Sequence, residues 1–263
     1  MAEPTFRLLI IGDEILSGRR QDKHFPHIVQ LLSQRGLALS SAEIISDNRE
    51  DIVRTLTRSF DSDDIVFCCG GIGATPDDQT RQAAAAALDL PLELHPEAAR
   101  LIAGRCAQMA QRGQGTADMS DPENQQRLQM GVFPQGAQIV PNTYNDIPGF
   151  FIREHTFVPG FPVMAWPMIE WMLDNRYADL HNKTPAIEIS FRVCGLPESR
   201  ITPALETVEQ RWQGMQTFSL PSVGGHDRPH IELGVKGQAG HVAQALDWLR
   251  AQALSLGGEI MPD

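Results

Sequence analysis

A glycine-rich stretch in the first third of the chain has the residue types of an anion-binding corner. Residues 65–80 read IVFCCGGIGATPDDQT, so a short apolar run leads directly into three glycines. Glycines allow the main chain to approach a ligand closely, and successive N–H groups in such a turn can hold an anion. A helix that begins there would add the partial positive charge of its N-terminus. The stretch therefore predicts a phosphate-binding loop built on Gly70, Gly71, Gly73 and Thr75.

The same residues also allow a purely structural interpretation. Thr75 as N-cap, Pro76 at the first helical position and Asp78 at the third would cap a helix without any ligand. The loop lacks the Gly-Lys-[Ser/Thr] ending of a Walker A motif, and it does not follow the G-x-G-x-x-G pattern. The sequence leaves both the phosphate-binding and the capping interpretation open.

Carboxylates are frequent near the ends of the predicted strands. A second loop, GDEILSGRR at residues 12–20, follows the first apolar run and carries one of them. Acids gathered at one sheet edge would repel one another unless a cation were present, and Mg²⁺ held by one or two carboxylates plus ligand phosphates is the simplest solution. Alternatively, these acids are helix caps and surface residues. The five concerned are Glu14, Asp22, Asp47, Asp77 and Asp78.

Apolar runs and amphipathic stretches alternate along the first ninety residues. This alternation predicts right-handed βαβ crossovers and a mainly parallel sheet that is covered on both faces. The carboxyl ends of such strands meet at one edge, where ligands bind in open α/β sheets. We expect strands at 6–11, 39–45 and 65–69, and helices at 22–35, about 48–60 and 77–88.

The patterns beyond residue 90 are weaker. Two helical stretches are expected over about 95–130, followed by short apolar runs that resemble edge strands or a β-arm, and by a closing helix. Residues 181–185 are the best linker candidate, and the strand–helix–strand–strand–helix pattern after them describes a small α+β unit. We therefore expect a ligand-binding domain at 1–180 and a small domain at 186–263. The short apolar runs lie at 139–140, 150–152 and 156–158, and the closing helix at 162–174.

The composition excludes several partner classes. Lys and Arg number 22 against 33 Asp and Glu, which gives the 263-residue chain a net charge of −11. An anionic surface repels phosphate backbones and anionic lipids, so neither nucleic acid nor a membrane is expected as a partner. The four cysteines form no C-x-x-C pair, and no secretory signal or membrane-length apolar run is present. These features predict a cytoplasmic protein with reduced thiols.

Several segments taken together resemble the MoaB/Mog molybdopterin-binding domain, and more closely its version at the N-terminus of the competence/damage-inducible protein A (CinA) family. The resemblance implies a three-layer α/β/α fold with a mainly parallel sheet, plus a small KH-like α+β domain at the C-terminal end. The segments that carry it are GDEILSG at 12–18, Asp47, GGIGATPDDQTRQAAAAAL at 70–88, NQQR at 124–127, Asn142, PGFP at 159–162 and GLPES at 195–199.

The resemblance also implies a pocket for a phosphorylated pterin or a nucleotide diphosphate. Asp47, Asp78 and Glu14 are then the candidate catalytic residues. Asp77 and Asp78 are the candidate ligands of a divalent metal, which would be Mg²⁺, Mn²⁺ or Co²⁺. The candidate ligand-binding residues are Gly12, Gly70, Gly71, Gly73, Thr75, Thr80, Lys23, Asn142 and Gly160.

Three functions remain open at this point. The first is a metal-dependent pyrophosphatase that acts on ADP-ribose or a related nucleotide diphosphate, in which a carboxylate orients the attacking water. The second is a molybdopterin-binding protein of molybdenum cofactor biosynthesis, and the third is a non-catalytic binding module of the same fold. In each case the resemblance implies a homo-oligomer, either a dimer or a trimer.

The chain departs from the family pattern at two places. Asp22-Lys23-His24 stands where the family usually has Asp-Thr-Asn, so a basic side chain can replace a polar ligand contact. Val163-Met164-Ala165 stands where Glu-Met is usual, so a carboxylate is missing. We do not expect the nicotinamide-nucleotide amidohydrolase domain of many longer members, and deamidation is therefore not implied.

Overall fold

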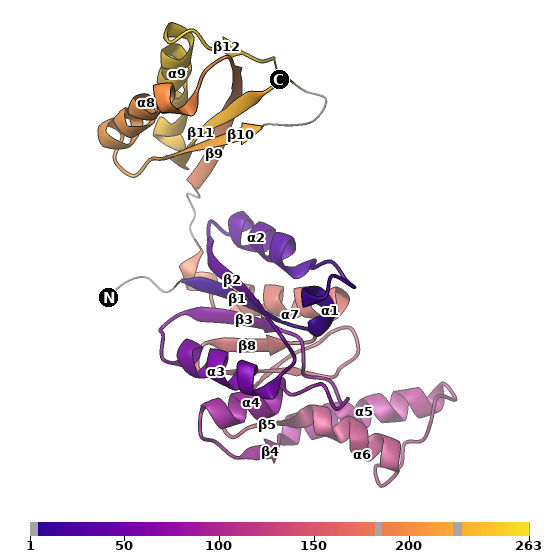
Figure 1. The fold of residues 1–263 in the computed structure, drawn as a ribbon. Coiled ribbons are helices and arrows are strands. Elements are labelled where there is room, and N and C mark those ends of the chain that lie inside the picture. Colours follow the sequence, from indigo (N-terminus) through magenta and orange to yellow (C-terminus); the bar gives the residue numbers. More distant parts are fainter. Residues whose placement is uncertain (1–4, 182–185, 223–227, 263) are drawn as a thin grey trace. The chain divides into compact units, whose positions relative to one another are not determined.

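The chain forms two compact units, Met1–His181 and Asn182–Asp263 (Figure 1). The apolar cores of the two units share no residue. The computed structural model describes residues 5–181, 186–222 and 228–262. Most of the expected linker, residues 182–185, lies outside the described residues. The two units are described separately.

A six-stranded sheet in the order β2-β1-β3-β8-β7-β6 forms the centre of the first unit. The pairings from β2 to β8 are all parallel, and β7 is antiparallel to both of its neighbours. The mainly parallel sheet predicted from the sequence is therefore confirmed. The strands are β1 (Phe6–Ile11), β2 (Leu39–Ile45), β3 (Ile65–Cys69), β6 (Gln138–Val140), β7 (Gly149–Ile152) and β8 (His155–Val158).

Helices cover both faces of this sheet, because successive side chains of its central strands point to opposite faces. In β1, Leu8 contributes to one apolar core and Leu9 to the other. The first core is completed by α2 and α7, and the second by α3, α4 and α5, which makes the three layers of Figure 1. The helices are α1 (Asp13–Leu16), α2 (His24–Gln34), α3 (Arg49–Phe60), α4 (Thr80–Ala87), α5 (Pro96–Gln111), α6 (Pro122–Leu128) and α7 (Pro162–Asn175), with 3₁₀ turns η1 (Gln129–Gly131) and η2 (Ala178–Leu180).

The short apolar runs after residue 138 are not all edge strands, and this expectation was wrong for two of them. β8 pairs with β3 on one side and with β7 on the other, and all four of its residues are buried. β6 is the edge strand of this side of the sheet. A small sheet of β4 (Leu92–Leu94) and β5 (Val132–Pro134) was not predicted, because three-residue strands carry too few residues to show a period.

The helix expected at 77–88 begins later, at Thr80. The Asp78 carboxylate accepts hydrogen bonds from the backbone N–H and the hydroxyl of Thr75, at 2.9 and 2.6 Å, and the Asp78 N–H donates to the Thr75 carbonyl. These bonds close a turn over residues 75–78. The Thr75–Asp78 pair expected as a helix cap therefore exists, but it stabilises the loop before the helix.

The second unit is a four-stranded antiparallel sheet in the order β10-β11-β9-β12, and its two helices share one apolar core with it. The element order agrees with the predicted strand–helix–strand–strand–helix pattern, and β12 adds a short fourth strand. Among the described residues, no helix is long and apolar enough to cross a membrane. The elements are β9 (Ala186–Cys194), α8 (Glu198–Arg211), β10 (Gln216–Ser222), β11 (His230–Gln238), α9 (Ala239–Ser255) and β12 (Glu259–Ile260).

Candidate functional site

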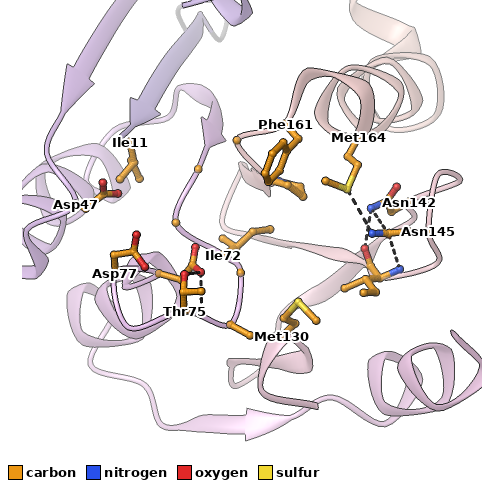
Figure 2. Close-up of a pocket in the computed structure, with 18 of the residues that line it drawn as sticks. Ile11, Asp47, Ile72, Thr75, Asp77, Met130, Asn142, Asn145, Phe161 and Met164 are labelled. Carbon is orange, nitrogen blue, oxygen red and sulfur yellow. Dashed lines mark hydrogen bonds between the residues drawn. The ribbon is translucent and has the colours of Figure 1, made fainter. Parts of the chain in front are cut away.

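A cavity of about 440 Å³ opens at the carboxyl ends of β1, β3 and β8 (Figure 2). Ile11 ends β1, and Gly70 and Pro159 directly follow β3 and β8; all three residues line the cavity. This edge is where ligands bind in open α/β sheets. We refer to this space as the main cavity.

Ten of the residues singled out from the sequence line the main cavity, and three do not. The three are Gly12, Lys23 and Thr80. Lys23 lines a neighbouring cavity that shares Glu14 and Gly160 with the main one. The ten are Glu14, Asp47, Gly70, Gly71, Gly73, Thr75, Asp77, Asp78, Asn142 and Gly160.

Thr80 and Gly12 hold the loops of the site in place instead of lining it. Thr80 is fully buried; its hydroxyl donates to the Gly70 carbonyl and its backbone N–H to the Gly71 carbonyl, both at 3.0 Å. The N–H of Gly12 donates to the Ile45 carbonyl at 3.1 Å, which joins the end of β1 to β2. Both residues therefore position the main chain beside the cavity.

The glycine loop packs too tightly for side chains at three of its positions. Gly70 has a φ of +114°, and a Cβ there would collide with the carbonyl oxygen of Ile11 at the end of β1. A Cβ on Gly73 would collide with the carboxylate of Asp78. Glycine is required at Gly70 because the loop lies directly against the end of β1, and at Gly71, where φ is +67°, because a Cβ would collide with the buried hydroxyl of Thr80.

Hydrogen bonds fix which way the peptide groups of this loop point. The Nη2 of Arg81 donates to the Gly73 carbonyl at 2.6 Å, and the Nε2 of Gln126 donates to the Ala74 carbonyl at 2.5 Å. In a trans peptide the C=O and the following N–H point in opposite directions. The N–H of Ala74 therefore points away from the Arg81 guanidinium, and Ala74 lines the main cavity. The Thr75 N–H is occupied by Asp78, as described above.

Four of the five acids noted in the sequence line the main cavity: Glu14, Asp47, Asp77 and Asp78. Asp22 does not, because its carboxylate accepts the backbone N–H groups of His24 and Phe25, each at 2.9 Å, at the start of α2. The capping interpretation thus applies to Asp22. The other four are gathered in one place, with Arg20 as the basic residue of the same lining.

Asp47 lies at the centre of this acidic group. Its Oδ2 accepts the backbone N–H of Asp13 at 2.9 Å. Burial raises the pKa of the Asp47 carboxyl, and the carboxylates of Asp13, Glu14 and Asp77 raise it further, while the hydrogen bond from Asp13 works in the opposite direction. A carboxyl of raised pKa among other acids is a common feature of functional sites.

The side of the main cavity that faces these acids is formed by apolar residues and asparagine side chains. Figure 2 shows Asp47 and Asp77 on one side, and Phe161, Met164 and Asn145 on the other. Ile72, Met130 and Ile147 add further apolar surface. The cavity therefore offers main-chain donors and carboxylates to one end of a ligand and a largely apolar surface to the other.

Asn142 and Asn145 are held by bonds to each other and to the loop that carries them. The Asn142 side-chain amide donates to the Asn145 Oδ1 at 2.8 Å and to the Ile147 carbonyl at 2.9 Å. The Asn145 amide in turn donates to the sulfur of Met164 at 3.4 Å. Met164 belongs to the Val163-Met164-Ala165 departure from the family, so this wall has a thioether in its lining.

Residues 7–179 match the model of a protein family described as "Probable molybdopterin binding domain". This chain belongs to that family. The match covers more than half of the chain and includes every residue of the main cavity. It confirms the resemblance based on the segments at residues 12–18 and 70–88.

Relatives of this chain include CinA-like proteins. The one from Anaeromyxobacter sp. (strain Fw109-5) is 31% identical over 206 residues, which are 76% of this chain and 47% of the relative. The chain thus spans about half the length of these relatives. A protein of Caldivirga maquilingensis is 27% identical over 264 residues and is covered to 96% of its length.

A solved structure supports the fold of this chain. The protein CinA from Thermoplasma acidophilum superposes with a TM-score of 0.54 at 22% sequence identity, over 65% of this chain and 98% of that one. At this level of identity the likeness establishes the architecture of the first unit and nothing about its ligand.

Several residues of the candidate site were not found from the sequence. Arg81 and Gln126 lie within the segments that resembled the family, but no pattern assigned them to the glycine loop. Arg20 ends the loop at 12–20 and Phe161 belongs to the PGFP segment, but neither was identified as a site residue, and Asn145 had no signal in the sequence. They reach the cavity from three separate segments, and only the packing of those segments brings them together.

Proposed function

We propose that this protein binds a nucleotide diphosphate or a similarly pyrophosphate-linked ligand in the main cavity and hydrolyses it in the presence of a divalent cation. The observation that carries the proposal is the division of the cavity into two chemically different ends. One end has the glycine loop and four carboxylates, and the other has an apolar and amidic wall. A pyrophosphate attached to a planar ring system likewise has one charged end and one largely apolar end.

The apolar end supports a ring-bearing ligand. A volume of about 440 Å³ lies within the range of small-molecule sites. Phe161 and Met164 offer aromatic and thioether surface, which suits a flat heteroaromatic ring. A purine and a pterin both meet this description, so this end does not distinguish between them.

The acidic end requires a cation if the ligand carries phosphates. Four carboxylates and one arginine would repel a pyrophosphate on balance. Within the described ranges, no group of three or more His, Cys, Asp or Glu side chains is placed to hold a metal ion. A cation here would therefore need oxygens from the ligand, as Mg²⁺ bound by one or two carboxylates plus phosphates does. Asp77 would hold it together with phosphate oxygens, which leaves Asp47 free for proton transfer, and it would neutralise charge on the pyrophosphate.

The chain's own residues provide the remaining functions. The N–H of Ala74, directed by the Arg81 bond to Gly73, is a main-chain donor for a phosphate oxygen. Asp47 has a raised pKa and is suited to take a proton from an attacking water, and Glu14 lines the same space and can orient that water. One carboxylate oxygen of Asp78 accepts both hydrogen bonds from Thr75, so we assign Asp78 to stabilising the conformation of the loop.

A molybdopterin ligand is the second candidate function, and the family match favours it. The phosphate of such a ligand would occupy the same loop and its pterin the same apolar wall. The two candidates differ in the bond that is broken, since simple binding of a pterin requires no hydrolysis. A non-catalytic binding module would show neither hydrolysis nor retained pterin.

The test is a direct assay on the purified chain. Incubation with ADP-ribose and Mg²⁺, Mn²⁺ or Co²⁺, followed by chromatographic separation, is expected to give AMP and ribose 5-phosphate, and excess EDTA is expected to abolish the reaction. Absence of AMP with all three metals contradicts the hydrolase proposal. Heat-released pterin fluorescence from the same preparation would then favour the second candidate.

A further inference from the structure

A second cavity, of about 380 Å³, shares Ala74 and Thr75 with the main cavity. Arg81 on α4 is the charged residue of its lining, and four glutamine side chains supply most of the other polar groups. No acidic residue lines it, in contrast to the four carboxylates of the main cavity. We refer to it as the arginine cavity. The four glutamines are Gln79, Gln82, Gln126 and Gln129.

Two buried polar atoms beside this cavity lack hydrogen-bond partners within the described structure. Arg81 is only 3% exposed; its Nη2 holds the Gly73 carbonyl, while its Nη1 is buried without a partner. The Oε1 of Gln82, the next residue, is also buried without a partner. Burying an unsatisfied polar group costs about 1–3 kcal/mol, and more for a charged one. A ligand oxygen can accept from the Arg81 Nη1, whereas the Gln82 Oε1 is an acceptor and needs a donor such as ordered water.

The charge of the lining indicates which kind of ligand fits. Burial lowers the pKa of Arg81 to about 10, so its guanidinium remains positively charged at neutral pH. Guanidinium groups bind phosphate and carboxylate oxygens strongly, and glutamine amides can donate to the same oxygens. An anion entering here would meet one positive charge; no carboxylate lines this cavity, and the nearby Asp78 carboxylate acts on Arg81 by raising its pKa.

We propose that the arginine cavity is a second binding site, which takes a small anion bearing a phosphate or carboxylate group on Arg81 and the surrounding glutamine amides. Nη1 is covered at present, so binding requires the neighbouring side chains to change rotamer. Gln129 is exposed, and exposed side chains change rotamer within nanoseconds. Because the same guanidinium holds the Gly73 carbonyl, an anion at this site would stabilise the glycine loop from its outer side. The proposal does not depend on the ligand of the main cavity.

Methyl NMR spectroscopy can test the site, because the two cavities have different methyl groups in their linings. Leu92 and Val132 line the arginine cavity, while Ile147 and Met164 line the main cavity. Titration of the methyl-labelled full chain with inorganic phosphate is expected to shift the Leu92 and Val132 signals saturably. A parallel titration with acetate shows whether a carboxylate serves as well as a phosphate.

Variants that add a negative charge then show whether the shifts come from an anion bound at Arg81. Gln82→Glu and, independently, the exposed Gln129→Glu place a negative charge in the arginine cavity, and each is expected to weaken phosphate binding there by about tenfold or more. Gln125→Glu adds the same charge on α6, beside Gln126 in sequence but outside the lining, and is expected to leave binding unchanged.

The outcomes separate this proposal from the function proposed above. If phosphate shifts only Ile147 and Met164, the main cavity binds phosphate and the second site does not exist. If neither Gln82→Glu nor Gln129→Glu weakens the shifts of Leu92 and Val132, Arg81 does not hold the anion and the proposal is wrong. Saturable shifts that both variants weaken support it, whether or not ADP-ribose is hydrolysed.

Discussion

At the scale of single residues, Asp47 has the environment that chemistry requires. It is partly buried, lines the main cavity and has other carboxylates around it, so that its pKa is raised. A carboxyl whose pKa is higher in the folded than in the unfolded chain costs stability once the pH rises through both values. At neutral pH the ionised Asp47 therefore lowers the free energy of unfolding, which is typical of a residue retained for function.

Asp47→Asn tests this interpretation. The substitution removes the charge with little change in shape, so we expect hydrolysis of ADP-ribose to fall by about 100-fold or more. The midpoint of thermal unfolding at pH 7 is expected to stay the same or rise, because the repulsion from Glu14 and Asp77 is relieved. Steady-state kinetics and thermal melts measure the two effects.

An exposed acid in the other unit, Glu206, provides the control for this prediction. Glu206→Gln removes the same charge far along the chain from the cavity residues and should change neither activity nor melting. Full activity of Asp47→Asn would show that Asp47 takes no part in the reaction.

At the scale of elements, the corner between β3 and the glycine loop is stabilised by close backbone contact. Gly70→Ala would place a methyl group against the Ile11 carbonyl at a positive φ, so we expect a loss of about 2–4 kcal/mol in the free energy of unfolding. Gly136 also has a positive φ, of +83°, but a Cβ there has no atom within 4 Å. Gly136→Ala should therefore cost only about 1–2 kcal/mol.

Urea denaturation of both variants measures this difference. An equal loss in the two proteins would mean that the positive φ alone matters and that the β1–loop contact contributes nothing. A larger loss in Gly70→Ala assigns the excess to the close approach of the two strand ends.

The β7–β8 turn and α3 meet at a buried histidine. The Nδ1 of His155 lies 2.6 Å from the Arg153 carbonyl and its Nε2 lies 2.7 Å from the Ser59 hydroxyl. Burial lowers the pKa of His155 to about 4, so the folded protein holds the neutral ring, with Nδ1 donating and Nε2 accepting. The unfolded chain binds the proton more readily, because its histidine titrates near 6.5.

Acidification should therefore destabilise the fold. Between pH 7 and pH 5 we expect the free energy of unfolding to fall by about 2 kcal/mol on account of His155, and to fall further until the pH passes about 4. In His155→Gln this part of the pH dependence should be lost. His241→Gln, at an exposed position of α9, should retain it. Urea midpoints at both pH values provide the measurement, and equal pH dependence in all three proteins contradicts the assignment.

At the scale of the whole molecule, the main cavity belongs entirely to the first unit. Its lining residues fall between Ile11 and Met164, and the apolar cores of the two units share no residue. We therefore expect a fragment of residues 1–181 to fold cooperatively and to bind the same ligand as the full chain. Circular dichroism melts and ADP-ribose titrations of both proteins check this. A fragment that is unfolded, or folded without binding, would show that the second unit is needed.

Much of the first unit could be predicted from the sequence. Buried parallel strands are continuous apolar runs, so β1 and β3 were visible in the sequence. β2 was also expected, although it is a largely exposed edge strand, and Asn48 caps α3 at the start of the helix expected at about 48–60. The glycine loop was also identified, since close approach and positive φ restrict the choice of residue to glycine. Both kinds of signal are local, and they depend on a few neighbouring residues alone.

The other features of the fold and the site depend on the tertiary structure. The position of β8 between β3 and β7, the separation of Asp22 from the other four acids, and the bond from Arg81 to Gly73 each depend on which distant segments pack together. The wall formed by Asn145, Phe161 and Met164 has the same origin. Local preference determines the conformation of a segment, whereas its neighbours are selected by the burial of apolar surface across the whole unit, which no short stretch of sequence encodes.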